Sequence, residues 1–293
     1  MKIKEIITST KNNNVFQKKP IKFLIAIFLM KSGLSKFFII KRKNYKLRFF
    51  PTPFSRTLWI EPDYWEDQDE FFISYVKKGD KIIDIGANIG TITLTCSKKT
   101  SNEGQVYSIE PNPNTFKFLE KNILLNKVSN VKLFNYAVGD KSGLVDFSII
   151  RSDGQSKIIE NEFINDPVVL KGKKIQVPVI SIDNLIKDES IFSLIKIDVE
   201  GYEKFVIQGA KNIIKNTKCI YFEVVEKNYK KYGYTAKEIY DLLQSYGFQL
   251  FLIKERSIVQ ISVSYKTYAT NILAIRDVDD FLSRTGYILK KVN

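Results

Sequence analysis

The chain has 293 residues, carries a net charge of +14 and is 44% hydrophobic, a globular composition with material for one large core, or for one core plus an appendage. It contains no histidine, which excludes a Cys/His metal centre and every mechanism with imidazole as the general base. The two cysteines, Cys96 and Cys219, fall in apolar segments, so we expect a reducing, cytoplasmic compartment and no disulfide framework.

The amino-terminal segment is basic and partly apolar. Residues 1–50 hold thirteen Lys or Arg and one acid, a net of +12, which leaves only +2 for the rest. The apolar stretch 21–40 is interrupted by lysines and is too short for the ~20 residues of a membrane span. Two interpretations stay open: the segment lies on an anionic membrane surface, at the inner face of the membrane, or it is an accessory helix packed on the domain. We take residues 1–60 as an extension and 61–293 as the main domain.

Strands and helices alternate along most of the remaining chain. Residues 46–50 read as a short strand, 51–59 as a loop and 64–76 as a helix. Further strands are expected at 82–85, 105–109, 131–138, 144–150, 174–180, 193–197, 219–225, 247–253 and 270–275, and further helices at 91–97, 111–126, 181–186, 203–214 and 235–246. Residues 151–157 form a polar loop where a substrate would be covered. This alternation predicts an α/β fold with a doubly wound parallel sheet.

A glycine turn follows the strand at 82–85. Gly86 and Gly90 occupy its first and fifth positions, and a helix begins directly afterwards. Strand, glycine turn and helix hold nucleotide-like cofactors at the carboxyl edge of an α/β sheet. Gly86 lets the backbone approach a ligand, and Gly90 permits close packing of the helix on the strand. Twenty residues after Gly90, Glu110 ends the next strand, where its carboxylate can accept hydrogen bonds from ribose hydroxyls.

The spacing differs from the dinucleotide pattern G-x-G-x-x-G, because Asn88 stands where the middle glycine would be. That glycine lets a pyrophosphate approach the backbone, so its absence, together with Asp84 before the turn, points away from NAD. The turn favours a cofactor with ribose and adenine but no phosphate, which is S-adenosylmethionine. The alternative is an ordinary βα turn of some other Rossmann-like domain.

Five motifs together resemble the FkbM-type methyltransferases: DIGANIG at 84–90, EPNP at 110–113, AVGD at 137–140, IKIDVEGYE at 195–203 and NILA at 271–274. The resemblance covers about residues 60–276, and the motif at 195–203 is the most specific part. It implies a class I (Rossmann-like) methyltransferase fold with a mostly parallel seven-stranded sheet and helices on both faces. It further implies S-adenosylmethionine as methyl donor and usually O-methylation, most often of glycan sugars or secondary metabolites.

The resemblance also assigns donor-binding residues by position. The turn residues for the methionine portion and ribose are Asp84, Gly86, Ala87, Asn88 and Gly90; Glu110 takes the ribose hydroxyls with Asn112 beside it, and Ala137 and Asp140 fall near adenine. Glu66 is either a cover over the donor or a first-turn acid of its helix, and we prefer the latter interpretation.

Methyl transfer from a sulfonium is an in-line displacement, in which alignment supplies ~7–11 kcal/mol of the barrier. A hydroxyl acceptor also needs a base, for which the candidates at the strand ends are Asp198, Glu200 and Glu223. Lys196 and Asp198 point to one side of their strand, so we predict Asp198 as base or acceptor-orienting group and Lys196 as its electrostatic partner. Glu200 either caps the next helix or joins Asp198 in binding Mg²⁺. A divalent metal is thus possible, but none is predicted.

The sequence therefore predicts an S-adenosylmethionine-dependent O-methyltransferase acting on a hydroxyl of a sugar, glycan or related metabolite. One alternative is an RNA methyltransferase that uses the basic amino-terminal segment; the nearly neutral catalytic part and the lack of an Asn/Asp-Pro-Pro-aromatic motif make nucleic acid an unlikely partner. The other is a binding module that keeps the donor pocket without catalysis. The sequence does not specify an oligomeric state.

Overall fold

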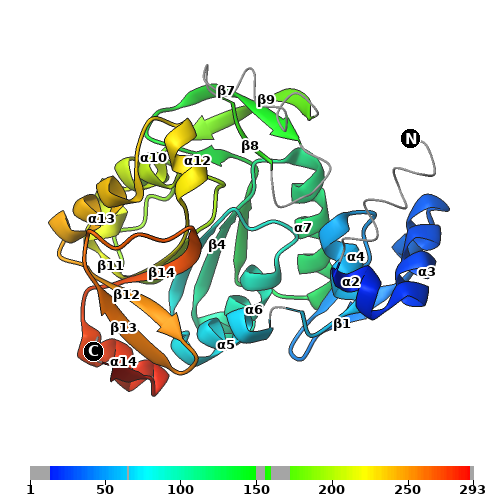
Figure 1. The fold of residues 1–293 in the computed structure, drawn as a ribbon, viewed down its shortest axis with the longest axis horizontal. Helices are drawn as coiled ribbons and strands as arrows, with labels where there is room; N and C mark the ends of the chain where they lie inside the picture. Colours follow the sequence, from blue (N-terminus) through cyan, green and yellow to red (C-terminus); the bar gives the residue numbers. More distant parts are fainter. Residues whose placement is uncertain (1–13, 65, 150–155, 160–171, 291–293) are drawn as a thin grey trace.

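The computed structural model describes residues 14–64, 66–149, 156–159 and 172–290, and only the backbone of 66–68. Its centre is a nine-stranded sheet of order β15-β13-β12-β14-β11-β10-β3-β4-β5 (Figure 1). These strands are β3 (Lys81–Ile85), β4 (Gln105–Ile109), β5 (Val131–Phe134), β10 (Phe192–Ile197), β11 (Thr217–Val225), β12 (Gln249–Lys254), β13 (Ser257–Ile261), β14 (Ala269–Ile275) and β15 (Ile288–Lys290). The five adjacent strands β11, β10, β3, β4 and β5 run parallel to one another. Strand β14 is antiparallel to both of its neighbours, β11 and β12.

The predicted α/β fold with a largely parallel sheet is confirmed, but the expected seven strands are nine, in a mixed sheet. The extra edge comes from β13 and β15, which pair with each other in parallel. A hairpin joins β12 to β13 through Glu255, whose φ of +56° is left-handed. Hairpin turns of this kind are normally signalled by Asn-Gly or Asp-Gly, and this chain carries no such signal there.

Helices cover both faces of the sheet. Alternate residues of β3 show the two layers: Ile82 packs with α5, α6 and α14, while Ile83 belongs to the core under α10, α11 and α13. The helices after residue 60 are α5 (Glu66–Tyr75), α6 (Thr91–Thr100), α7 (Pro113–Asn126), α9 (Ile182–Leu185), α10 (Glu203–Gln208), α11 (Lys211–Lys215), α12 (Glu226–Lys231), α13 (Ala236–Ser245) and α14 (Val278–Thr285), with a 3₁₀ turn η2 (Ser101–Glu103). No helix in the described part of the chain is both long and apolar enough to span a membrane.

A second, four-stranded sheet lies over the carboxyl edge of the first, in the order β6-β9-β7-β8. Its strands are β6 (Ala137–Val138), β7 (Gly143–Ile149), β8 (Lys157–Ile158) and β9 (Lys173–Ile180). The single strand expected at 131–138 was therefore wrong: it is divided between the two sheets. Asn135 fixes the break, because its side-chain amide donates to the carbonyl oxygens of Glu110 and Pro111 at 2.8 and 3.1 Å. Most of the polar loop expected at 151–157 lies outside the described residues.

Two further expectations were wrong. The expected helix 203–214 is two helices, α10 and α11, separated at Gly209. A Cβ on Gly209 would lie 2.0 Å from the Gly139 carbonyl oxygen, so this break lets the chain approach β6 closely. The loop expected at 51–59 is instead mostly the helix α4 (Pro53–Ile60), capped by the Thr52 hydroxyl and started by Pro53. Thr followed by Pro is an N-terminal helix signal that the sequence analysis missed.

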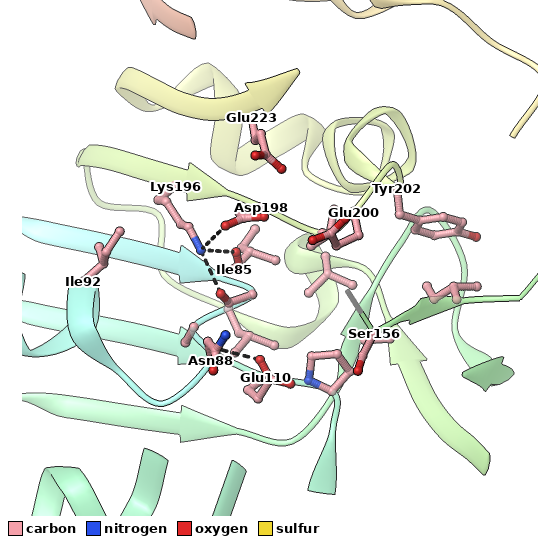
Figure 2. A pocket seen from close by; sticks show the side chains of 18 of the residues that line it. Ile85, Asn88, Ile92, Glu110, Ser156, Lys196, Asp198, Glu200, Tyr202 and Glu223 are labelled. Atoms are coloured by element: carbon pink, nitrogen blue, oxygen red, sulfur yellow. Dashed lines mark hydrogen bonds and ion pairs between the residues drawn. The ribbon is translucent and has the colours of Figure 1, made fainter. Parts of the chain in front are cut away.

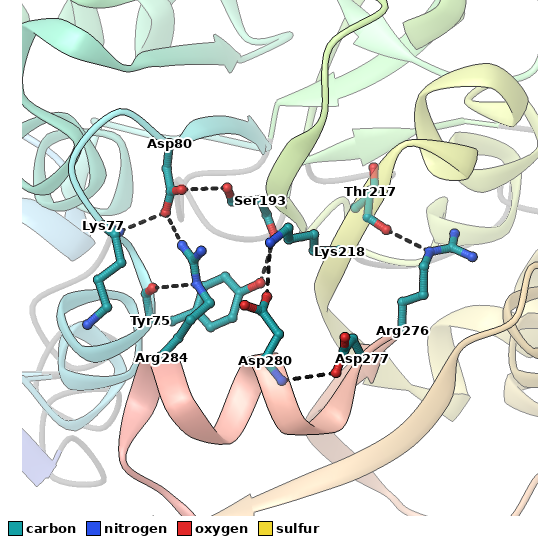
Figure 3. Close-up of polar contacts among 10 residues, drawn as sticks. All are labelled: Tyr75, Lys77, Asp80, Ser193, Thr217, Lys218, Arg276, Asp277, Asp280 and Arg284. Atoms are coloured by element: carbon teal, nitrogen blue, oxygen red, sulfur yellow. Dashed lines mark hydrogen bonds and ion pairs between the residues drawn. The ribbon is translucent and has the colours of Figure 1, made fainter.

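Polar side chains tie α14 to the amino ends of the central strands (Figure 3). Arg284 pairs with Asp80, which also accepts from the Ser193 hydroxyl at 2.6 Å. Lys218 pairs with Asp280 at 3.0 Å. Ion pairs thus hold α14 at the amino ends of the strands. The carboxyl edge, at the other end of the sheet, stays available for a ligand.

The amino-terminal segment packs on the domain. It contains α2 (Asn14–Lys18), α3 (Pro20–Lys31), the 3₁₀ turn η1 (Leu34–Phe37), the hairpin of β1 (Ile39–Lys41) and β2 (Lys46–Arg48), and α4. Phe23 and Leu47 are buried in one hydrophobic cluster with Leu94 of α6 and Leu119 of α7. The backbone amide of Arg48 also donates to the Asn122 side chain at 2.9 Å. Residues 14–60 therefore share a core with the main domain, and the boundary predicted at residue 60 stays a prediction.

This packing predicts that two phenylalanines on one helix differ sharply in their effect on stability. Phe23 is 2% exposed and Phe28 is 63% exposed. We expect Phe23→Ala to lower the free energy of unfolding by ~3–5 kcal/mol, the cost of a core cavity. The matched Phe28→Ala variant should stay within about 0.5 kcal/mol of wild type. Urea unfolding followed by circular dichroism measures both, and equal effects would contradict the packing of α3 on the core.

Candidate active site

A cavity of about 590 Å³ opens where β3, β4 and β10 end. Because β4 lies on one side of β3 and β10 on the other, this is the point at which the strand order reverses, where open α/β sheets bind ligands. The cavity is lined by Phe54, Ile85, Gly86, Ala87, Asn88, Thr91, Ile92, Ile109, Glu110, Pro111, Tyr136, Ala137, Val138, Phe147, Ser156, Ile158, Lys196, Asp198, Val199, Glu200, Tyr202, Glu223 and Asn271. Its volume suits a ligand of cofactor size.

The glycine turn after β3 forms one wall. Gly86 has a φ of +76°, and its amide donates to the Ile109 carbonyl at 3.0 Å, which ties the turn to the end of β4. A Cβ on Gly86 would lie 1.9 Å from the Asp198 carbonyl oxygen. Only glycine therefore allows the turn after β3 and the turn after β10 to come this close.

Glu110 closes the next part of the wall at the end of β4. Its carboxylate accepts from the backbone amide of Asn88 at 3.0 Å (Figure 2) and from that of Asn112 at 2.9 Å. Burial raises the pKa of Glu110 to about 7, although these two amide bonds act in the opposite direction. Each carboxylate oxygen can accept a second hydrogen bond, so the group is held in place with acceptor capacity left for a ligand.

A buried lysine lies beneath the two turns. Lys196 and Asp84 are register partners on β10 and β3, so their side chains fall on the same face of the sheet. The Lys196 ammonium lies 3.6 Å from Asp198 (Figure 2). It also lies 3.4 Å from Asp84 and donates to the Gly86 carbonyl at 2.8 Å. Although burial works against the charge, the Asp198 and Asp84 carboxylates raise the pKa of Lys196, so it remains cationic.

Three carboxyl groups face the same space beyond this lysine (Figure 2). Oxygens of Asp198, Glu200 and Glu223 lie within 4.8 Å of one another, close enough to share a cation. Burial, then the neighbouring Asp198 and Glu223, raise the pKa of Glu200 to about 9. Burial and Asp198 likewise raise the pKa of Glu223 to about 7, against the attraction of Lys196. The Asp198 side chain has 42% of its surface exposed, whereas its partner Lys196 has 4%.

The Glu203 carboxylate stabilises the turn that carries Asp198 and Glu200. Glu203 is 1% exposed and accepts from the Val199 and Gly201 amides at 3.1 and 3.4 Å. Burial raises the pKa of Glu203 to about 8. Glu200 itself has a φ of +57°, a conformation that few non-glycine residues adopt. The turn is therefore a positioned element rather than a free loop, and Glu203 is its support.

Several predicted donor residues lie off the cavity. Asp84 is fully buried, pairing with Lys196 and accepting from the Thr93 hydroxyl at 2.6 Å. The Asn112 side chain caps α7, and Asp140 is exposed and does not line the cavity. Gly90 begins α6 with a φ of +93° and packs towards Leu119 of α7. The Glu66 side chain lies outside the described residues.

The structure brings other predicted residues together in one wall: Gly86, Ala87, Asn88, Glu110, Ala137, Lys196, Asp198, Glu200 and Glu223. Sequence reasoning missed Phe54, Tyr136 and Asn271 among the lining residues. Asn271 had a signal, because it opens the NILA motif at 271–274, one of the five motifs that resemble the family. Phe54 had none, since its helix was expected to be a loop.

Comparison with known proteins agrees with these motifs. The family model described as the methyltransferase FkbM domain matches residues 84–250, more than half of the chain. The hexuronic acid methyltransferase AglP of Haloferax volcanii is 27% identical over 173 residues, which are 57% of this chain and 66% of that protein. The 2-O-methyltransferase NoeI of Sinorhizobium fredii is 26% identical over 186 residues, 59% of this chain and 75% of NoeI.

Among solved structures, TYW2 of M. jannaschii in complex with AdoMet aligns with a TM-score of 0.41 at 15% identity, covering 80% of this chain and 83% of that one. The match to AglP spans just under two thirds of that relative's length. The family model, however, covers the glycine turn, Glu110 and the whole turn after β10. The family predicted from the sequence is confirmed: this chain belongs to the FkbM methyltransferases.

Proposed function

We propose that the protein is an S-adenosylmethionine-dependent O-methyltransferase whose acceptor is a hydroxyl of a sugar, glycan or related metabolite. The observation that carries this proposal is the position of Asp198. Its carboxylate is paired with the buried Lys196 ammonium at 3.6 Å and lines the same cavity as the glycine turn and Glu110. Donor-holding groups and a candidate base thus share one space.

The residues at the glycine turn fit the donor. Glu110 offers unused acceptor positions for ribose hydroxyls, and Ala137 is a small residue where an adenine can lie flat. The Asn88 side-chain oxygen is buried and has no hydrogen-bond partner among the described residues. An orphaned buried acceptor costs free energy, and a bound ligand that donates to it removes that cost. When bound here, S-adenosylmethionine supplies an electrophilic methyl group on a sulfonium.

The chain's own residues then orient and deprotonate the acceptor. A hydroxyl placed between Asp198 and the donor can give its proton to the Asp198 carboxylate as it attacks. Lys196 holds that carboxylate in place, and Glu203 holds the turn that carries it. Glu200 keeps its proton at neutral pH, because its pKa is about 9, so it can donate a hydrogen bond to an acceptor oxygen.

Relatives support a sugar acceptor. AglP is named for a hexuronic acid and NoeI as a 2-O-methyltransferase, and they match 57% and 59% of this chain. The carboxyl groups of the cavity suit a polyhydroxyl ligand, since each can accept or donate a hydrogen bond. We also propose a cytoplasmic location, because Cys96 and Cys219 are both buried and free, as suits a reducing compartment.

The proposal predicts that Glu110→Ala weakens donor binding. Loss of a charged hydrogen bond costs ~1–3 kcal/mol, or about 5- to 150-fold in the Kd for S-adenosylhomocysteine. Titration calorimetry measures the change. As a matched control, Glu103→Ala removes an exposed acid of η2 and should leave the Kd unchanged. Wild-type protein that binds neither S-adenosylmethionine nor S-adenosylhomocysteine would overturn the proposal.

Asp198→Asn should reduce turnover by about 10²-fold or more, the usual contribution of a general base, with donor affinity within about threefold of wild type. The assay is transfer of labelled methyl from S-adenosylmethionine to a panel of sugars and hexuronic acids. Asp140→Asn, at an exposed acid off the cavity, is the control. Unchanged turnover of Asp198→Asn removes this residue from catalysis. Activity lost to a chelator and restored by Mg²⁺ would instead assign the three carboxylates to a metal.

The raised carboxyl pKa values predict a pH-dependent stability. Glu110, Glu200 and Glu223 have folded-state pKa values of about 7, 9 and 7, above the ordinary 4.5 of an unfolded glutamate. The folded protein therefore binds more protons than the unfolded chain above pH 4.5, so stability falls as pH rises towards these values.

We expect the free energy of unfolding of the ligand-free protein to fall between pH 5 and pH 9, as measured by urea unfolding. Glu200→Gln removes one of the groups that titrate over this range, so the decline should become shallower by up to about 1.4 kcal/mol per pH unit. Asp140→Asn, at an exposed site, should leave the slope as it is. A slope that does not change in Glu200→Gln would show that Glu200 is ionised in the folded protein.

A further inference from the structure

Helix α3 presents a stripe of apolar side chains to the outside of the molecule. Ile21, Leu24, Ile25 and Phe28 are all exposed, and the exposed fractions of Ile21 and Phe28 are 75% and 63%. Their spacing of three, four and seven residues places them on one face of the helix. We call these four residues the α3 stripe. Large apolar side chains gathered on one exposed face mark an interaction surface more often than single exposed ones do.

The opposite face of α3 is fixed to the body of the protein. Phe23, Ala26 and Leu29 are buried in the cluster that includes α4, α6 and α7. Lys22 also donates to the Ile60 carbonyl at 2.9 Å. Because the opposite face of α3 is buried, the side chains of the α3 stripe point away from the core. Helix α3 itself lies at the outside of the molecule (Figure 1).

The surface continues into the 3₁₀ turn η1, which follows α3 directly. Leu34 and Phe37 are exposed there, Phe37 to 71%. The Lys36 ammonium lies 5.1 Å from the centre of the Phe37 ring. An apolar ring with a cation beside it is the pattern of side chains that sit at the boundary between hydrocarbon and lipid head groups.

The segment that carries this surface is basic. Residues 14–60 contain eleven Lys or Arg and no Asp or Glu. Lys31, Lys36, Lys41 and Lys43 are exposed and form no ion pair with a described residue. Lys31 follows Phe28 by three residues and so flanks the α3 stripe. A partner for this surface must combine an apolar interior with a negative exterior.

We propose that the α3 stripe, with Leu34 and Phe37 of η1, docks the protein on an anionic lipid bilayer. The helix has 12 residues, so it is about 18 Å long, too short for the ~30 Å hydrocarbon core, and it must lie along the surface. Its apolar side chains enter the head-group boundary while the lysines attract anionic lipids. A nucleic acid would satisfy the lysines, but it would leave the mainly aliphatic stripe without a partner.

The test is co-sedimentation of the full-length protein with vesicles of phosphatidylcholine alone or with 30% phosphatidylglycerol. We expect wild type to pellet with the anionic vesicles and to remain in solution with the neutral ones. Leu24→Gln/Phe28→Gln should lower the partition coefficient by about 100-fold, since each large apolar side chain contributes at least a factor of ten. Lys31→Glu/Lys36→Glu should lower it by about 25-fold or more, at about fivefold for each lysine.

Matched controls use the same chemistry elsewhere on the surface. Leu124→Gln changes a leucine of α7 that is 75% exposed, and Lys211→Glu/Lys215→Glu changes two exposed lysines of α11. Both should bind vesicles as wild type does, and S-adenosylhomocysteine binding reports that every variant is folded.

Three results would overturn the proposal. Undiminished vesicle binding by Leu24→Gln/Phe28→Gln would show that the stripe is not the docking face. A dimer in vesicle-free solution that becomes a monomer in that variant would assign the stripe to a second copy of this chain. Salt-sensitive RNA binding lost in Lys31→Glu/Lys36→Glu, without any vesicle binding by wild type, would assign the basic surface to nucleic acid.

Discussion

The site depends on one buried cation. Lys196 comes from β10 but makes its closest contact with the carbonyl of Gly86, in the turn after β3. A lysine ammonium removed from water costs several kcal/mol unless its charge and all its donors are compensated. Here carboxylates of Asp84 and Asp198 supply the charge and two carbonyls supply hydrogen bonds. If the turn after β3 and the turn after β10 moved apart, the Lys196 ammonium would lose these partners while still buried. The same interactions therefore stabilise both the fold and the site.

The lysine also explains the uneven behaviour of the surrounding acids. Its charge is shared by Asp84 and Asp198, so little is left for Glu200 and Glu223, whose pKa values burial raises to about 9 and 7. In the ligand-free protein, burial therefore favours the protonated forms of Glu200 and Glu223.

The parts of the site that sequence predicted well are those governed by strand alternation. Lys196 and Asp198 had to point to one side of β10, and they do. The partner of Lys196 across the sheet was not predictable in the same way. Asp84 was taken as a donor contact, yet it lies fully buried against the lysine. Finding that pair requires knowing that β3 and β10 are neighbours in register, and sequence order alone does not contain this.

Other differences arise from a local signal that was used for α7 but not for α4. Asn112 stands before Pro113, and Thr52 before Pro53, and both pairs start helices. Reading them so would have predicted α4 and would have explained the Asn112 side chain as a cap. The hairpin at Glu255 is different, because its left-handed residue is neither glycine nor asparagine. The long-range pairing of β12 with β13 holds that turn, and no local rule predicts it.

Some residues that line the cavity lie inside the range of the family model, and others lie outside it. The family model covers residues 84–250, which include the glycine turn, Glu110 and the turn after β10. Phe54 and Asn271 line the same cavity from outside that range. Phe54 belongs to α4, which shares the hydrophobic cluster of α3, so the segment that closes the cavity is continuous with the one that carries the apolar stripe. The groups that we assign to the donor thus lie within the family region, while the amino-terminal segment adds a lining residue, Phe54, from outside it.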